Sequence, residues 1–249
     1  MDTRRRVLGI ARHGDTPKDE HGLSLDSLTD KSVQSMYIQG RMFDLTDAGR
    51  GVKSDRVFVL HSDKKRTVST ARARLAGIRG MPKPSVESDL EEFNFDGTLF
   101  ICDDRLSYES LKLNDSAMKK MGLPAYTDWM LANRYATEME GKPVTSFQQI
   151  YDSRKPVLGD AVRRMIVADH DLGIISTHGV ISDAIAMAAV DSARSTPVDR
   201  FEEIGGQFNK EDIAYLVIDS NAKSGRTSSK LVRGKICLPV NLDKISQEY

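Results

Sequence analysis

The chain has 249 residues, of which 39% are hydrophobic and 29% are charged, and its formal net charge is zero. This length suits one large α/β domain or two small ones, and the composition is that of a soluble globular protein. A zero net charge provides no general attraction to nucleic acid or to an acidic membrane surface, so we expect neither as a partner. Any cationic site must therefore be local.

Membrane and disulfide signals are weak. No apolar run approaches the ~18 residues that a membrane span needs, and the apolar stretch before Arg12 is too short for the core of a signal peptide. The two cysteines, Cys102 and Cys237, lie far apart in the sequence, which fits a reduced protein better than a disulfide scaffold. We therefore expect a cytoplasmic protein.

Apolar runs alternate with helical patterns along the chain. Strands are predicted at residues 7–11, 57–60, 173–176, 213–218 and 235–240. Helices are predicted to begin at Thr46, as an N-cap, and at Asp63, the latter ending before Gly80 and Pro82; two more run through residues 162–167 and 180–190. Strands that alternate with helices predict a three-layer α/β/α sandwich around a mostly parallel sheet.

Residues 98–155 carry little strand signal and one weakly periodic helical piece, from Tyr108 to Met121. We interpret this segment as a mainly helical insertion that covers the sheet. The segment has no clear interdomain linker, so we expect a single domain over residues 1–249.

Polar residues of similar chemistry follow three of the predicted strands. Arg12-His13-Gly14 ends the first, His61-Ser62-Asp63 ends the second and precedes Arg66, and His178-Gly179 ends the third. In α/β sheets ligands bind beyond the carboxyl ends of the strands, where helix N-termini favour anions. Guanidinium groups bind phosphate oxygens in pairs. Each residue alone could be a solvated turn or a core residue, but together they predict a phosphate site.

Five segments in this order resemble the histidine phosphatase superfamily, in the branch of the cofactor-dependent phosphoglycerate mutases and related phosphatases. They are RHGDT at 12–16, LTDAG at 45–49, SDKKRTVSTA at 62–71, LEEFNFDG at 90–97 and STHG at 176–179. The resemblance spans most of the chain and implies a phosphoglycerate mutase-like fold. We expect a phosphorylated small molecule as the partner and no cofactor, although sugar phosphates, nucleotides, phosphoproteins and phosphoglycerate all stay open as substrates.

The resemblance implies a role for each residue. His13 is the nucleophile that forms a phosphohistidine, and Arg12, Arg66 and His178 hold the phosphoryl oxygens. Thr16 and the backbone N–H of Gly179 are further donors. Spacing from Leu90 favours Glu92 as the proton donor to the leaving oxygen, with Glu91 as the alternative.

The sequence departs from the family pattern at three places. Asp19 stands where members often carry an asparagine that touches phosphate, and a carboxylate there would repel the substrate. Asp96-Gly97 reverses the usual glycine-then-acid order, which leaves the choice between Glu91 and Glu92 open. Lys64 and Lys65 precede Arg66 in place of a commoner apolar residue.

Four functions remain open from the sequence. The segment after Gly97 is acidic at first and lacks the tryptophan of the mutases, which favours a metal-independent phosphomonoester hydrolase over a phosphoglycerate mutase-type phosphotransferase. A non-catalytic binder of phosphorylated ligands is a third reading. The fourth is a metal-dependent phosphoesterase, with ligands drawn from His13, Asp15, His61, His178 and Asp183. Neither the substrate nor the oligomeric state follows from the sequence, and an oligomer is open.

Overall fold

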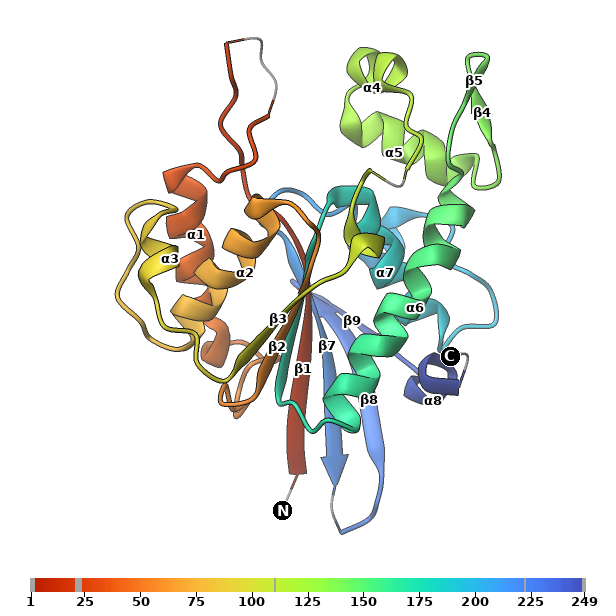
Figure 1. Ribbon diagram of the computed structural model, residues 1–249. Helices are drawn as coiled ribbons and strands as arrows, with labels where there is room; N and C mark the ends of the chain where they lie inside the picture. Colours follow the sequence, from red (N-terminus) through yellow and green to blue (C-terminus); the bar gives the residue numbers. More distant parts are fainter. Residues whose placement is uncertain (1–2, 21–23, 110, 222, 248–249) are drawn as a thin grey trace.

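A seven-stranded sheet forms the centre of the computed structural model, which describes residues 3–20, 24–109, 111–221 and 223–247 (Figure 1). The strands lie side by side in the order β3-β2-β6-β1-β7-β8-β9. Their bounds are β1 Thr3–Arg12, β2 Val57–His61, β3 Thr98–Cys102, β6 Leu172–Thr177, β7 Ile213–Asn221, β8 Thr227–Arg233 and β9 Ile236–Pro239.

Strand direction and register determine where the polar strand ends meet. β3, β2, β6 and β1 pair in parallel, whereas β7, β8 and β9 pair antiparallel in succession, so five of the seven strands point the same way. Arg12 pairs with Thr177, and His61 pairs with Ser176. The carboxyl ends of β1, β2 and β6 are therefore level, and the residues that follow them share one edge.

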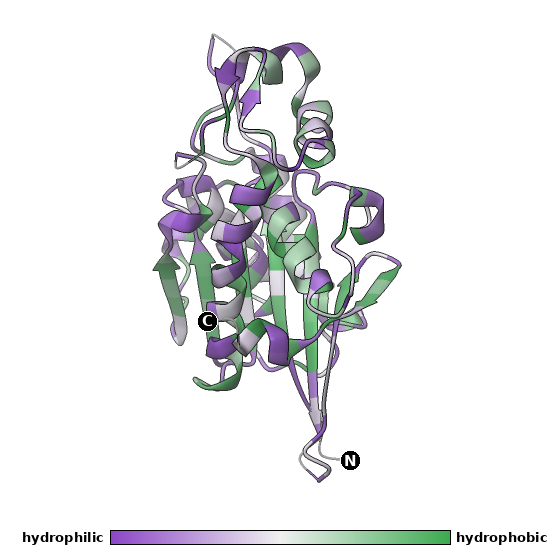
Figure 2. Cartoon of the chain, turned by 90° about the vertical axis from the view of Figure 1, so that its right-hand side faces the viewer, coloured by the Kyte–Doolittle hydropathy of each residue, from purple (hydrophilic) through white to green (hydrophobic). Residues whose placement is uncertain are grey.

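Helices cover both faces of the sheet, which confirms the three-layer sandwich (Figure 1). α1 (Asp30–Arg41), α2 (Lys65–Ile78) and the short α3 (Asp89–Glu92) lie on one side, and α6 (Phe147–Ile166) and α7 (Gly179–Asp191) on the other. Figure 2 shows mainly hydrophobic central strands beneath helices that carry hydrophilic segments. α8 (Leu242–Gln247) ends the described chain. No helix within the described ranges is long and apolar enough to cross a bilayer.

The segment expected as a helical insertion differs from the prediction at its start. Residues 98–102 form β3, at the edge of the central sheet, where Leu99 is 48% exposed. The strand does contain a short apolar run, residues 99–102, which the prediction did not recognise as a strand. The helix expected from Tyr108 begins only at Asp115, because the Asn114 side chain accepts the N–H of Ala117 and caps it. The rest forms a cap beyond the strand ends (Figure 1), from the 3-10 turn η2 (Asp104–Leu106) through α4 (Asp115–Met121), α5 (Leu123–Ala132), β4 (Glu138–Met139) and β5 (Lys142–Pro143).

Other element boundaries also differ from expectation. Thr46 does not begin a helix: it follows a 3-10 turn, η1 (Phe43–Leu45), and its hydroxyl accepts the N–H of Gly49 at 3.0 Å, which closes a tight turn. α6 begins 15 residues before the predicted Val162, because Ser146 and Gln149 form a capping box and the helix continues through Pro156. β8 was not predicted, and η3 (Phe201–Ile204) precedes the loop that leads to β7.

Candidate active site

The structure brings His13 and His178 together at the carboxyl edge of the sheet. β1 ends at Arg12, and the backbone N–H of His13 then bonds the carbonyl of Thr177 at 2.9 Å. β6 ends at that same threonine, so His178 follows directly and Gly179 begins α7. The two imidazole ring centroids lie 5.1 Å apart in an edge-to-face arrangement.

His13 is held in one tautomer. Its side chain is buried, and Nδ1 lies 2.7 Å from the carbonyl oxygen of Gly14. Because a carbonyl only accepts, Nδ1 carries the proton and Nε2 keeps a free lone pair. Burial, followed by the charges of Arg66 and Arg12, lowers the pKa of His13 to about 3. The imidazole is therefore neutral at physiological pH, as a nucleophile must be.

His178 is also neutral, and the residue that follows β2, Ser62, holds its ring in place. The Ser62 hydroxyl lies 3.1 Å from His178 Nε2. Burial lowers the pKa of His178 to about 2, and His13 and the two arginines add to the effect. Nδ1 is buried and has no partner among the described residues. An imidazole with an unused buried nitrogen can still bond a ligand oxygen.

Both expected arginines lie at this edge, and each keeps a guanidinium N–H group that has no partner among the described residues. Arg12 Nη1 donates to the carbonyl of Phe208 at 2.5 Å, while Arg66 Nη1 lies 3.4 Å from the carbonyl of Leu25. The Nε atoms of Arg12 and Arg66 are buried and lack partners in the described part of the chain. A Cβ placed on Gly179 would lie 3.1 Å from the Arg12 guanidinium carbon, so Gly179 and Arg12 are in close contact. Together these groups can bind an anion.

The turn after His13 packs against α1 and the loop before β7. Thr16 is buried in this turn, and the backbone N–H of Asp15 bonds the Ser32 hydroxyl at 2.7 Å. The Asp15 carboxylate accepts from Lys210 Nζ at 2.7 Å. Asp19 lies farther along, in the loop that the bridge between residues 18 and 24 closes, and its effect on phosphate stays a prediction.

The expected proton donors lie on the surface of α3. Glu91 pairs with Lys65 Nζ at 2.8 Å, and this bond lowers the pKa of the carboxyl. Glu92 is exposed, and no described hydrogen bond or ion pair joins it to His13 or His178. The structure does not bring either carboxylate against the histidines, and the role of Glu92 stays a prediction.

Sequence reasoning missed Tyr108, whose ring packs against His178 with centroids 4.5 Å apart. Tyr108 follows β3 and η2, so it reaches the site from a strand that was not predicted. Ser62 was seen only as part of a motif, although it positions His178. A polar residue after a fourth parallel strand would have been the signal, once β3 was recognised.

A cavity of about 440 Å³ opens beside Arg12. Gly179 and Asp183 of α7 line it, α5 forms a second wall, and Phe208 and Lys210 complete it from the loop before β7. Asp183 is buried and accepts the backbone N–H of Phe208 at 2.7 Å. The cavity adjoins Arg12 and Gly179, and its volume suits a small molecule.

The proposed metal ligands have other partners or lie apart. His61 Nδ1 lies 2.7 Å from the carbonyl of Ser62, and its ring faces Phe100 on β3. Within the described ranges, no three His, Cys, Asp or Glu side chains are arranged to hold a metal ion. Both cysteines are exposed and free.

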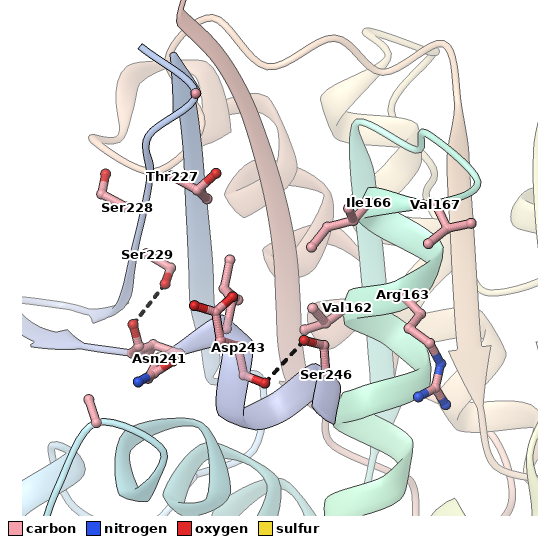
Figure 3. Close-up of a pocket in the computed structure, with 14 residues that line it drawn as sticks. Val162, Arg163, Ile166, Val167, Thr227, Ser228, Ser229, Asn241, Asp243 and Ser246 are labelled. Atoms are coloured by element: carbon pink, nitrogen blue, oxygen red, sulfur yellow. Dashed lines mark hydrogen bonds between the residues drawn. The ribbon is translucent and has the colours of Figure 1, made fainter. Parts of the chain in front are cut away.

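A larger cavity, of about 950 Å³, lies between the end of α6, β8 and α8 (Figure 3). Its walls carry hydroxyl, amide and aliphatic side chains, including Val162, Thr227 and Asn241. α6 leads from this end of the molecule into the start of β6, so the cavity lies at the opposite edge from the histidines. We assign it no role in the chemistry.

Solved structures share this fold. No protein-family profile and no curated protein sequence matches the chain. Mycobacterial hydrolase 2 aligns over 99% of this chain and 97% of its own, with 15% identity and a TM-score of 0.53. Mycobacterial glucosyl-3-phosphoglycerate phosphatase aligns over 92% and 97%, with 15% identity and a TM-score of 0.52. Mycobacterial hydrolase 1 aligns over 91% and 96%, with 16% identity and a TM-score of 0.51. The chain has the fold of these hydrolases over nearly its whole length.

Proposed function

We propose that this chain is a histidine phosphatase that hydrolyses phosphomonoesters of small molecules through a phosphohistidine on His13, without a metal ion. The observation that carries the proposal is the neutral imidazole of His13, whose free Nε2 lies at the same sheet edge as Arg12, Arg66 and His178. A nucleophile beside unpartnered cationic donors suits attack on phosphorus. A fold neighbour that is a glucosyl-3-phosphoglycerate phosphatase supports a phosphorylated small molecule as substrate.

In this mechanism His13 Nε2 attacks phosphorus, and the bond to the leaving oxygen breaks. Arg12 and Arg66 offset the charge on the equatorial oxygens, and the free nitrogen of His178 bonds one of them. The backbone N–H groups at the start of α7, beginning with Gly179, add partial positive charge. The leaving oxygen takes up a proton, from Glu92 if the sequence prediction holds. Water then attacks phosphorus and gives up a proton as the N–P bond breaks, so that inorganic phosphate leaves and the electron pair returns to Nε2.

The first test measures phosphate release from a panel of phosphomonoesters in the presence of EDTA. We expect wild-type protein to be active and His13→Ala to lose more than about 10³-fold in kcat. His170→Ala, a change in a histidine that packs on Phe58, is the matched control and should stay active. Activity that survives in His13→Ala would overturn the mechanism, and activity lost on chelation would favour a metal-dependent enzyme.

The same assay separates hydrolysis from phosphoryl transfer and from mere binding. A mutase would move the phosphoryl group to a second hydroxyl and release little inorganic phosphate. An enzyme that turns over should also yield an acid-labile, base-stable phosphoenzyme in a rapid quench, and His13→Ala should not. A protein that binds phosphate but forms no phosphoenzyme would be a binder only.

A further inference from the structure

Glu211 connects the turn after His13 to α1 and to the loop before β7. Its carboxylate accepts hydrogen bonds from the hydroxyls of Ser32 and Ser35, two residues of α1, and the bond from Ser35 measures 2.6 Å. Ser32 is fully buried, and its oxygen accepts the backbone N–H of Asp15 at 2.7 Å. The Ser32 hydroxyl therefore donates to a carboxylate while it accepts from the turn that carries His13.

This contact determines where the carbonyl of Gly14 points. The N–H of Asp15 and the C=O of Gly14 belong to one planar trans peptide unit, in which they point in opposite directions. Ser32 holds the N–H of this unit, so the carbonyl on its other side faces His13, whose Nδ1 lies 2.7 Å from it. The unit has little room to turn, because a Cβ on Gly14 would lie 2.7 Å from Ser32 Oγ. The tautomer of His13 therefore depends on a peptide plane that Ser32 fixes.

The hydrogen bonds between His13 and Glu211 all run in one direction. Nδ1–H of His13 donates to the Gly14 carbonyl. The N–H of the same peptide unit donates to Ser32, whose hydroxyl donates to Glu211. Bonds aligned in this way polarise and strengthen one another in the protein interior. A carboxylate at the end of the chain thus favours the proton on Nδ1, which leaves the lone pair of Nε2 free.

The backbone of Glu211 lies in the left-handed region, with φ at 68°. Glycine adopts this conformation readily, whereas a residue with a Cβ is strained there. The buried guanidinium of Arg74 donates to the Glu211 carbonyl, and the Glu211 N–H bonds the carbonyl of His13 at 3.4 Å. Strain that the surroundings maintain in this way gathers at functional positions. Glycine could make both backbone bonds, so the bonds from α1 are what glutamate adds at this position.

We infer that Glu211 is a positioning residue for His13. It acts through Ser32 and the peptide unit after Gly14, and it holds the nucleophile in the tautomer with the proton on Nδ1. The inference rests on the proposed phosphatase function, in which Nε2 is the attacking atom. When Nε2 bonds to phosphorus the imidazole becomes more positive, and the same chain of hydrogen bonds stabilises that charge.

The test removes the carboxylate and leaves the backbone in place. Glu211→Gly fits the left-handed conformation, can keep both backbone bonds of that residue and loses only the side chain. Ser32→Ala breaks the same chain one step closer to His13. Ser35→Ala is the matched control, because it removes the other hydrogen bond to the carboxylate and leaves the chain to His13 intact.

Rapid quench with 2,4-dinitrophenyl phosphate measures the rate of phosphohistidine formation. This ester needs no proton at its leaving oxygen, so the rate reports the nucleophile. We expect Glu211→Gly and Ser32→Ala each to lower the rate by about 10-fold to 100-fold, and the double variant to lose little more than either, since both break one chain. Glu211→Gln still offers an oxygen to the Ser32 hydroxyl and should recover most of the rate. The dissociation constant for inorganic phosphate should stay within about twofold, because both arginines are unchanged.

Nitrogen NMR of the imidazoles reports the tautomer directly. The chain has five histidines, and the His13 signals are those that are missing from His13→Gln. Wild type and Ser35→Ala should show His13 with its proton on Nδ1, and Glu211→Gly should show a mixture of the two tautomers.

An unchanged tautomer in Glu211→Gly would overturn the inference. An equal loss of rate in Ser35→Ala would also overturn it, because Glu211 would then only pack α1 against the loop. If wild-type protein forms no phosphohistidine from the ester, the proposed function fails. The spectra of wild type and Glu211→Gly would still show in that case whether Glu211 sets the tautomer of His13.

Discussion

Gly179 carries no side chain at a point where the Arg12 guanidinium fills the available space. An added Cβ would lie 3.1 Å from Cζ and 3.3 Å from Nε and Nη1 of that arginine. Such contacts are tighter than van der Waals packing allows without a shift of a few tenths of an ångström. The Nε atom of Arg12, which has no partner among the described residues, is one of those crowded atoms, so the position of the guanidinium depends on this glycine.

We therefore expect Gly179→Ala to lower the activity without lowering the stability. Displacing the guanidinium should lower kcat/KM by about tenfold to a hundredfold, because misplacement of a positioning group is costly. Alanine is also the better helix former, so the free energy of unfolding should hold or rise by up to about 1 kcal/mol. Steady-state kinetics and denaturant titration check the two halves, and an unchanged kcat/KM would show that Arg12 does not bind substrate.

Single residues of the site were predictable where short motifs carry them. His13, Arg12 and His178 follow buried strands whose apolar runs are plain in the sequence, and the structure places them together. Tyr108 could not be found in this way, because it follows an edge strand with exposed side chains and has no motif of its own. Glu92 was assigned by spacing along the chain, and spacing does not tell which side of α3 faces the site.

At the scale of elements, the loop before β7 is tied to the site from three directions. Arg12 donates to the carbonyl of Phe208, Asp183 accepts that residue's N–H, and the Arg233 guanidinium lies 4.0 Å from the centroid of its ring. Arg233 also donates to the carbonyl of Gln207 at 2.7 Å. The same loop places Lys210 in the wall of the cavity beside Arg12, so these contacts fix one side of that cavity.

Asp183 should make the stability of this junction depend on pH. Burial raises the pKa of Asp183 to about 7. The folded state thus holds a proton that the unfolded chain loses near its ordinary carboxyl pKa, and this stabilisation is present at low pH and lost as pH rises through 7. Asparagine keeps an acceptor for Phe208 without the charge. Asp183→Asn should therefore gain stability relative to wild type between pH 5 and pH 8, by roughly 3 kcal/mol.

Denaturant titrations at pH 5 and pH 8 measure that difference. Asp44→Asn, at an exposed aspartate, serves as the control and should show no such change between the two pH values. An Asp183→Asn effect of the same size at both pH values would mean that the carboxyl does not titrate in this range in the folded protein.

The buried central strands could be predicted from the sequence, and two of the less buried strands could not. β1, β2 and β6 have neighbours on both sides and read as continuous apolar runs, such as Val57 to Leu60. β8 begins with four polar residues and has only Leu231 and Val232 as an apolar pair, so it gives no such run. β3 gives a short run at the edge of the sheet, but it stands at the start of a segment that otherwise shows little strand pattern. The start of α6 depends on the capping box at Ser146, a local side-chain bond that periodicity does not show.

Across the whole molecule, the net charge is zero, but charged side chains gather in two separate clusters. At the amino end of β1, Arg4, Arg6 and Arg56 pair with Asp169 and Asp171, so the arginines of this cluster have carboxylate partners. At the carboxyl edge, Arg12 and Arg66 keep unpartnered donors among the described residues. The net charge of the chain therefore says nothing about the local field at the histidines, which is cationic.

The same burial that keeps His13 neutral should make the whole fold sensitive to acid. Its folded pKa of about 3 lies below the ordinary value of 6.5, so the unfolded chain takes up a proton first as pH falls. The stabilisation is present above pH 6.5 and is lost as pH falls toward 3, at about 1.4 kcal/mol per pH unit for a fully titrating group.

Replacing His13 by Gln removes the pH-dependent contribution of His13 to stability. The free energy of unfolding should then depend less steeply on pH. Between pH 6.5 and pH 5 we expect wild type to lose about 2 kcal/mol more than His13→Gln. Comparing slopes cancels any uniform destabilisation that the substitution itself causes, and it cancels the opposite contribution of Asp183, which both proteins share. Parallel slopes for the two proteins would mean that His13 is protonated as readily when folded as when unfolded. A nucleophile of that kind would be cationic at mildly acidic pH, so phosphohistidine formation at pH 5 should then fail in the quench experiment as well.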